Sequence, residues 1–390
     1  MVTCVALMTC AVPDVFAEGL WSGASRLSDE PSSARVPDMA ASPDGLVHLV
    51  WYDARNGSPE IYYKVWDGTI WGEDERLTFA DEESRRPQVA TDPWSRVHVV
   101  WNDWRDGDFE IYYKMKDWGS WTPDKRLTFD PSNQSYPSVA ADAAGFVHTV
   151  WSDGRELYNS EIYYRRGDGF LWDPEIRLTE NEGSSSKPAV AAGPDGLVHV
   201  TWYDMREGAN EVYYKSWDGQ VWSQDLRVSD SLTGSWYQNM AVDAMGNLHL
   251  VWLDKSDGNW EVYYRKKSST AWGEITRVTF NDARAGNPEV AVDAGGRVHI
   301  VWRDFRDGNT EIYYTALNQG RWTAETRLSR TPTPSRRPTV SVDADGRIIV
   351  VFMEDMDEEI ALLWVRGRLP TLDLDSSRDI IVPIDPPLDN

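Results

Sequence analysis

The stretch VHVVWNDWRDGDFEIYYK, residues 97–114, occurs six times in nearly intact form along the 390-residue chain. The other intact copies start at Val47, Val147, Val198, Leu248 and Val298, and a degraded copy starts at Ile348. Successive copies lie 50 residues apart, and once 51. A fixed period of this length is typical of repeat arrays and β-propellers, so it outweighs any division into domains by chain length alone.

Each repeat contains four strand-like runs separated by turn signals. In the second repeat they cover 87–91, 97–103, 110–115 and 121–127, and Asp106-Gly107 marks the turn between the second and third runs. The second run begins VHVVW and is largely apolar on both faces, as strands are when both sides of their sheet are covered. Such sheets, packed face to face in a ring, are the blades of a propeller.

The fourth run of each repeat carries a tryptophan followed five residues later by an arginine. This pair occurs seven times, at Trp21/Arg26, Trp71/Arg76, Trp121/Arg126, Trp172/Arg177, Trp222/Arg227, Trp272/Arg277 and Trp322/Arg327. The first pair precedes every copy of the central stretch, and no such pair follows the last copy. We therefore predict an all-β, seven-bladed propeller with four-stranded antiparallel blades, closed by an N-terminal strand that completes the last blade. An open solenoid is the alternative, but it leaves this split blade unexplained and its edges uncovered.

The formal net charge of −24 argues against nucleic acid and anionic membrane surfaces as partners. A high acidic count admits calcium sites, which only a matching spacing of ligands would reveal, and no cofactor or metal is otherwise expected. The two cysteines, Cys4 and Cys10, precede the repeats, so no disulfide is expected within them.

The sequence divides into a signal-peptide-like segment at 1–17, the propeller at 18–369 and a tail or linker at 370–390. The first segment lacks a basic start, so a disordered overhang or a lipid anchor is the alternative. No later segment has the roughly 20 consecutive apolar residues needed to span a bilayer. We expect a secreted monomer, located outside the cell, in a periplasm or at the cell surface.

Some polar residues recur in almost every repeat. All six histidines occupy one position, His48, His98, His148, His199, His249 and His299, and a ring would hold them too far apart to share a metal ion, so we expect structural hydrogen bonds. The second run ends in Trp-x-Asp, with an arginine two residues later and a glutamate opening the third run. We predict that these charges form one network that fixes the intervening turn. Its members in the first two repeats are Asp53, Arg55, Glu60, Asp103, Arg105 and Glu110.

Between the third and fourth runs, three repeats read Asp-Gly-x-x-Trp, at Asp67–Trp71, Asp168–Trp172 and Asp218–Trp222. This spacing resembles the Asp-box (BNR) repeats of sialidase-like β-propellers, and the resemblance covers about residues 20–369. It implies a propeller architecture, with the aspartates holding structural turns. Sialidases also grip a carboxylate with three arginines, the first in an Arg-Ile-Pro motif, to which Arg35-Val36-Pro37 is similar in sequence and position.

The residues before the first run of each repeat vary, and in a propeller they ring one mouth of the channel. Three repeats that closure makes neighbours carry Arg-x-Pro, and aromatic residues and Lys187 occupy this place in others. The predicted ligand-binding residues are Arg35, Arg85, Arg336, Arg86, Arg337, Trp236, Tyr237 and Tyr136.

We therefore expect a propeller that binds a glycan or another anionic ligand at this mouth without catalysis, because arginine suits carboxylates and aromatic rings suit sugar faces. A sialidase-like glycoside hydrolase is one alternative, and it requires a nucleophile and an acid/base carboxyl group near the arginines. A protein-interaction scaffold is the other. It predicts a flat or plugged mouth, with the arginines paired to Glu82, Glu83 or nearby aspartates.

Overall fold

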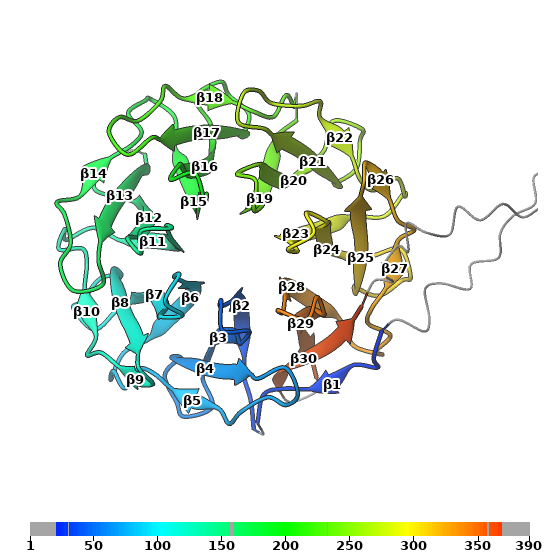
Figure 1. Cartoon of the computed structure of the whole chain (residues 1–390), viewed down its shortest axis with the longest axis horizontal. Coiled ribbons are helices and arrows are strands. Elements are labelled where there is room, and N and C mark those ends of the chain that lie inside the picture. The colour runs from blue at the N-terminus through cyan, green and yellow to red at the C-terminus, as the bar shows by residue number, and fades with distance from the viewer. Residues whose placement is uncertain (1–20, 30, 157–158, 232, 357–358, 369–390) are drawn as a thin grey trace, which may run out of the picture.

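The computed structural model describes residues 21–29, 31–156, 159–231, 233–356 and 359–368. Within these ranges the chain forms seven antiparallel sheets around a central channel (Figure 1). The seven-bladed, all-β architecture predicted from the repeat is confirmed. The described ranges contain no helix long and apolar enough to cross a membrane. The predicted segments at 1–17 and 370–390 lie outside the described residues.

The blades repeat one strand order from the channel outwards. Blade one contains β2 (Arg35–Ala41), β3 (Val47–Asp53), β4 (Glu60–Trp66) and β5 (Glu75–Arg76). Blade two contains β6 (Ser84–Thr91), β7 (Val97–Asp103), β8 (Glu110–Asp117), β9 (Ser120–Trp121) and β10 (Lys125–Arg126). Blade three contains β11 (Gln134–Ala141), β12 (Val147–Asp153), β13 (Glu161–Gly167) and β14 (Ile176–Arg177). Blade four contains β15 (Ser185–Ala192), β16 (Val198–Asp204), β17 (Glu211–Trp217) and β18 (Leu226–Arg227).

The remaining blades follow the same order. Blade five contains β19 (Ser235–Val242), β20 (Leu248–Asp254), β21 (Glu261–Lys267) and β22 (Thr276–Arg277). Blade six contains β23 (Ala285–Val292), β24 (Val298–Asp304), β25 (Glu311–Asn318), β26 (Arg321–Trp322) and β27 (Thr326–Arg327). Blade seven contains β28 (Ser335–Val342), β29 (Ile348–Asp355) and β30 (Ile360–Gly367), and it is completed by β1 (Ser25–Arg26).

Closure of the ring joins the two ends of the described chain. Strand β1 pairs with β30, with Ser25 opposite Trp364, and Trp21 forms a bridge to Gly367. The Trp21 ring also meets Tyr314 of blade six edge-on, with ring centroids 4.8 Å apart. The split last blade is therefore confirmed, and neither end leaves an open sheet edge at this seam.

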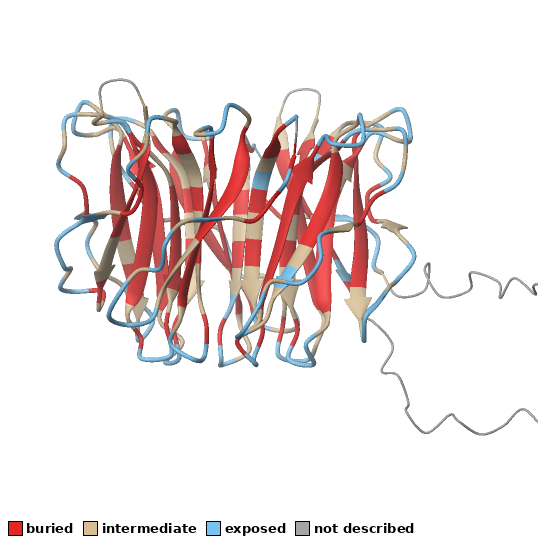
Figure 2. Ribbon diagram, turned by 90° about the horizontal axis from the view of Figure 1, so that it is seen from above, coloured by how far each residue is buried: buried red, intermediate tan, exposed pale blue. Residues whose placement is uncertain are grey.

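The core lies between the blades. Every residue of β7 is buried, and the second and third strands of each blade carry most of the buried residues, whereas the strand nearest the channel is only partly buried (Figure 2). One cluster packs Val50 and Ile61 of blade one against Val99 and Trp101 of blade two. Alternate residues of each central strand thus face opposite neighbours, which explains why both faces of that run are apolar.

Two strands of blade two differ in extent from the prediction. In blade two the inner strand begins at Ser84, not at residue 87, because it continues through a β-bulge. The single outer run predicted for 121–127 is instead two short strands, β9 and β10, which pair with β8. Pro123 lies between them and lacks the N–H needed to continue the ladder.

The histidines have the predicted structural role. Nδ1 of His98 lies 2.8 Å from the hydroxyl of Tyr113, and the same pairing recurs for all six histidines. In blade seven, Ile349 replaces the histidine and Trp364 replaces the tyrosine, as the strand pairing shows. The two partners are thus lost together, as expected when each satisfies the other's buried polar atom.

The repeated charges form two networks, so the prediction of one network was wrong. Asp103 is fully buried and accepts hydrogen bonds from Arg105, from the Trp101 indole at 2.7 Å and from the hydroxyl of Ser84 at 2.9 Å. Glu110 instead binds Arg126 and Thr128. Asp53 and Glu60 follow the same division, pairing with Arg55 and Arg76 respectively at 2.7 and 2.6 Å. In both blades the arginine of the outer strand binds the glutamate, and Arg55 and Arg105 pair with the aspartates instead.

The Asp-Gly turns have the structural role that the Asp-box resemblance implied. The Asp67 carboxylate accepts hydrogen bonds from the backbone N–H groups of Thr69 at 2.7 Å and Ile70 at 2.8 Å. Asp168 and Asp218 bind their turns in the same way. Two backbone donors on one carboxylate oxygen fix such a turn.

Candidate site at the channel mouth

A β-bulge occurs at the same place in the inner strand of every blade. In blade two the pairing register shifts between Arg85 and Gln88, and Arg86 within the bulge has a positive φ of 53°. The equivalent residue of each blade has a φ between 46° and 56°, although none is glycine, and the seven residues are Val36, Arg86, Tyr136, Lys187, Tyr237, Asn287 and Arg337. Left-handed backbone is uncommon for such side chains, and a bulge re-aims the residue it contains.

These seven residues line one cavity in the centre of the ring. The cavity has a volume of about 480 Å³ and includes the next inward-facing residue of each inner strand. The first layer, at the mouth, is formed by the bulge residues. The second layer consists of Asp38, Gln88, Ser138, Ala189, Asn239, Glu289 and Thr339. The bulge therefore places one variable side chain from each blade around a common space.

Three bulge residues are cationic, and they are spread around more than half of the ring. Among the described residues, Arg86, Lys187 and Arg337 form no ion pair with a carboxylate, although most other repeated arginines do. Arg86 stacks on the ring of Tyr136 at 4.4 Å, and the Lys187 ammonium lies 4.6 Å from the ring centre of Tyr237. Both contacts are favourable cation–π interactions, but a neutral aromatic ring does not cancel the positive charge of Arg86 or Lys187.

Crowding of these charges is reflected in their titration. Burial, followed by the charges of Arg86 and Arg337, lowers the pKa of Lys187 to about 8. Burial and the nearby charge of Arg86 also lower the pKa of Arg337. The mouth is therefore a positive region on a chain whose overall charge is strongly negative, and a bound anion would relieve the repulsion within it.

Arg303 of β24 adds a fourth positive charge that the sequence analysis did not identify. Burial is the main cause of its lowered pKa, and the charges of Arg336 and Arg337 contribute. Its side chain occupies the space over Gly286, where an added Cβ would lie 2.3 Å from Nε. In blade six, Gly286 stands where other blades have Arg35, Arg85 or Arg336, and an arginine occurs instead on the adjacent strand at Arg303. This shift of the arginine from one strand to the next is the sequence signal that could have revealed Arg303.

The structure divides the predicted site residues into two groups. Arg86, Arg337, Tyr136 and Tyr237 line the channel cavity. The remaining four, Arg35, Arg85, Arg336 and Trp236, lie one position earlier, on the rim, and do not line it.

The rim residues have partners of their own. Arg85 pairs with Glu83, and Arg336 lies 3.0 Å from Asp355. Trp236 packs against Tyr203 with ring centroids 5.2 Å apart. The variable middle residue of each Arg-x-Pro motif, not its first arginine, therefore reaches the channel.

Two carboxyl groups lie in the second layer, below the cations. Burial raises the pKa of Asp38 to about 7, although its carboxylate accepts a hydrogen bond from the Val89 N–H at 2.8 Å. Burial, followed by the charge of Asp38, raises the pKa of Glu289 well above its usual value. Both carboxyl groups therefore hold their protons more tightly than an exposed carboxyl group does. Within the described ranges, no group of three or more His, Cys, Asp or Glu side chains could hold a metal ion.

Comparison with known proteins supports the fold. No protein-family model matches the sequence, and no curated protein sequence matches it. An ulvan lyase from a new family of polysaccharide lyases is similar in structure, with a TM-score of 0.61 and 12% identity over 86% of this chain and 94% of its own. A fungal alcohol oxidase in complex with copper has a TM-score of 0.58 and 11% identity over 89% of this chain and 76% of its own. The NanB sialidase from Streptococcus pneumoniae reaches a TM-score of 0.47 and 10% identity over 88% of this chain and 70% of its own. At these identities, the similarity to the lyase and the oxidase supports the fold alone.

Proposed function

We propose that this propeller binds an acidic glycan at the channel mouth. The observation that carries the proposal is the set of unpaired cations, Arg86, Lys187 and Arg337, around a concave cavity on a chain of charge −24. A carboxylate or sulfate group would supply the missing negative charge, and the planar guanidinium groups can bind it through two parallel hydrogen bonds.

Aromatic side chains beside the cations favour a sugar over a simple anion. Tyr136 and Tyr237 line the same cavity, and Tyr237 retains an exposed fraction of 38%. Their rings offer flat apolar faces next to the charged groups, as a pyranose ring with an acidic substituent requires. The rim arginines Arg85 and Arg336 have the acidic partners that the scaffold alternative predicts. Among the described residues, however, the inner cations are unpaired and line a hollow mouth, which supports ligand binding. The similar ulvan lyase has also been solved bound to -[GlcA(1-4)Rha3S]-, which suggests uronate and sulfated sugars as first probes.

Binding should be tested with immobilised and soluble acidic oligosaccharides, including uronates, sulfated sugars and sialosides. The variant Arg86→Ala/Arg337→Ala removes two channel cations, and Arg85→Ala/Arg336→Ala removes the adjacent rim arginines as a matched control. We expect the first to lose binding by at least about tenfold per charge contact and the second to keep most of it. Equal losses in both variants would place the ligand on the rim, and selective loss in the control would refute the channel site.

A glycoside hydrolase is a second candidate, favoured by Asp38 and Glu289 in the same cavity. A protonated carboxyl group and an ionisable neighbour are the pair that glycoside hydrolysis uses. Turnover of a fluorogenic sialoside or uronide, abolished in Glu289→Gln, would establish this activity. Binding without turnover would leave the chain a glycan-binding protein.

We also propose that the protein is exported, since an extracellular or periplasmic location would bring the mouth into contact with glycans. The support is the signal-peptide-like composition of residues 1–17. Mass spectrometry of the mature N-terminus from fractionated cells tests this proposal, and an intact Met1 on cytosolic protein would contradict it.

A further inference from the structure

Blade two carries an exposed tryptophan in a strained turn. Strands β8 and β9 are joined by Trp118-Gly119, whose φ angles are 46° and 82°. Trp118 is 98% exposed, so it contributes almost nothing to the folded core. At the same place, blades one, three and four have Gly68, Gly169 and Gly219, which adopt positive φ without strain. Folding therefore gives no reason for a tryptophan here.

A second exposed tryptophan lies on the neighbouring turn of the same blade. Trp94 follows β6, is 63% exposed, and takes the place of Asp44, Ala144, Asp195, Met245, Gly295 or Asp345 in the other blades. Its ring rests on Gly145 of blade three, where an added Cβ would lie 1.7 Å away. The Arg96 guanidinium lies 5.0 Å from the ring centre and is held by Asp92 at 2.5 Å. Trp94 is thus supported from beneath, with much of its surface exposed.

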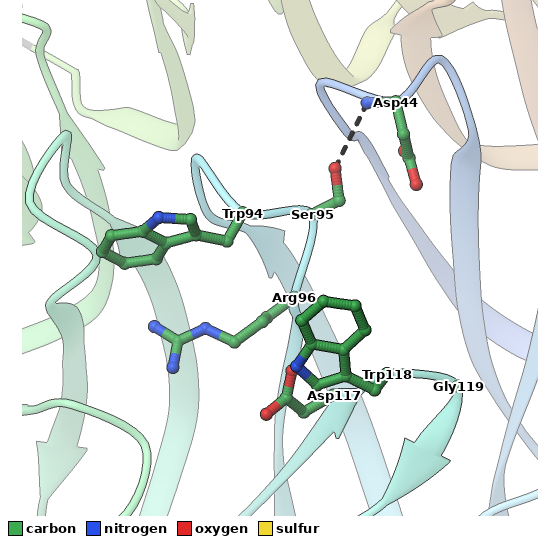
Figure 3. Close-up of a pocket in the computed structure, with 7 residues that line it drawn as sticks. All are labelled: Asp44, Trp94, Ser95, Arg96, Asp117, Trp118 and Gly119. Carbon is green, nitrogen blue, oxygen red and sulfur yellow. Dashed lines mark hydrogen bonds between the residues drawn. The ribbon is translucent and has the colours of Figure 1, made fainter.

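The two tryptophans border a cleft of about 530 Å³. Figure 3 shows their indole rings on opposite sides of Arg96, with Asp117 below Trp118 and Asp44 across from it. Ser95 accepts a hydrogen bond from the backbone N–H of Asp44 at 3.2 Å, which ties the turns of blades one and two together. The cleft lies at the opposite end of β6 from Arg86, so it is separate from the channel mouth by roughly 20 Å of strand.

We propose that this cleft binds a neutral glycan chain by stacking pyranose rings on Trp94 and Trp118. A pyranose has an apolar C–H face, which suits an indole, and a rim of hydroxyl groups, which suits Asp44, Asp117 and Ser95. Among the residues that line the cleft, these two tryptophans are the only large apolar ones, and their neighbours are mostly polar. The core of a protein–protein interface is usually broader and more apolar, so the lining fits a sugar better than a protein partner.

The charges of the cleft select against ionic ligands. Asp44 and Asp117 would repel an anion, and Arg96 already pairs with Asp92. A cationic ligand would have to approach Trp94 beside the Arg96 guanidinium. An uncharged sugar avoids both conflicts, so the channel mouth and this cleft would serve chemically different parts of a glycan.

Affinity electrophoresis of the whole chain in gels containing xylan, galactomannan, laminarin or hydroxyethyl cellulose tests the proposal, followed by calorimetry with the hexasaccharide of any polymer that retards it. Trp118→Asn creates the Asn-Gly pair that two-residue hairpin turns favour, so this variant should fold at least as stably as the wild type. We expect it, and Trp94→Ala, to bind at least about tenfold more weakly. Arg86→Ala/Arg337→Ala, which alters only the mouth, should bind the neutral polymer normally.

Three results would overturn the proposal: no retardation by any of the neutral polymers, unchanged affinity in Trp118→Asn, or equal loss in the mouth variant. The acidic-glycan assay is read independently, because its ligands and its critical residues differ. A protein that binds only acidic probes would therefore refute the cleft and support the mouth, and the reverse result would do the opposite.

Discussion

Replacing Lys187 by methionine is expected to stabilise the free protein and to weaken anion binding. Burial and the charges of Arg86 and Arg337 lower the pKa of this amine from 10.5 to about 8. At about 1.4 kcal/mol per pH unit, that difference corresponds to about 3 kcal/mol of unfavourable interaction in the charged form. Water in the open channel screens part of it, so we expect a gain of about 1–2 kcal/mol at pH 7. Methionine has a similar length and no charge.

The sign of the pH dependence follows from the lowered pKa. The unfolded chain holds the Lys187 proton more tightly than the native state does, so stability rises as the pH passes from about 8 to about 10.5. Below pH 8 the charged amine destabilises the native wild type fully, and above pH 10.5 it no longer does. The advantage of Lys187→Met should therefore be greatest near pH 7 and should shrink by pH 10.

Urea unfolding of both proteins at pH 7.0 and pH 9.5 measures this difference, and the intrinsic tryptophan fluorescence reports the transition. Lys114→Met is a suitable control, because Lys114 is paired with Asp124 at 2.7 Å and its removal should destabilise the protein. The reasoning fails if Lys187→Met is less stable than the wild type at pH 7. It also fails if the difference between them does not change with pH.

Three further expectations concern the ligand, the networks and the seam. Affinity for an acidic oligosaccharide should fall by up to about tenfold per pH unit above pH 8, because Lys187 loses its proton there. Calorimetry between pH 6 and pH 9.5 measures this dependence. A constant affinity would show that the arginines bind the ligand without Lys187. Asp103→Ala should lower the free energy of unfolding by about 3–5 kcal/mol, because it leaves Arg105 without its buried partner. Arg105→Ser should lower it less. Ser256 already replaces this arginine in blade five, where its hydroxyl donates a hydrogen bond to Asp254 at 2.5 Å. Similar losses of thermal stability in the two variants would contradict that distinction. Trp21→Ala should lower the free energy of unfolding by about 2–3 kcal/mol and speed amide hydrogen exchange in β30, because Trp21 pairs with Gly367 and packs against Tyr314 where the ring closes. An unchanged exchange rate would show that the seam does not depend on Trp21.

The sequence was sufficient for the architecture because each feature of it is repeated. The apolar second run indicated sheets covered on both faces, and the seven Trp/Arg pairs indicated the split blade, both of which the structure contains. The structural role of the histidines was also predicted, since six equivalent positions cannot meet at one metal ion, but their tyrosine partners were not. Repetition makes these inferences strong, because a local error in one repeat is corrected by the others.

The bulge could not be predicted from local preferences, because it opposes them. Six of the seven bulge residues precede a proline, and that position favours extended backbone, yet all of them adopt positive φ. Packing of the inner strand against neighbouring blades overrides the local preference. As a result, the sequence analysis placed Arg35, Arg85 and Arg336 at the mouth together with Arg86 and Arg337, whereas only the latter pair lines the cavity. The partner of Glu60 was also missed, because the sequence placed Arg76 on the fourth run but did not show that its side chain faces Glu60 of the third run.

Constancy and variation have separate places in this fold. The buried Asp103 and His98 networks recur because they hold the strands of each blade together. The bulge keeps its backbone conformation in all seven blades while its side chain changes from Val36 to Arg86 to Tyr136. A scaffold that fixes the strained backbone independently of the side chain can display any residue toward the channel. Selection for a ligand can then act on seven positions without altering the packing that closes the ring, which is why the charge of the mouth can oppose the charge of the whole chain.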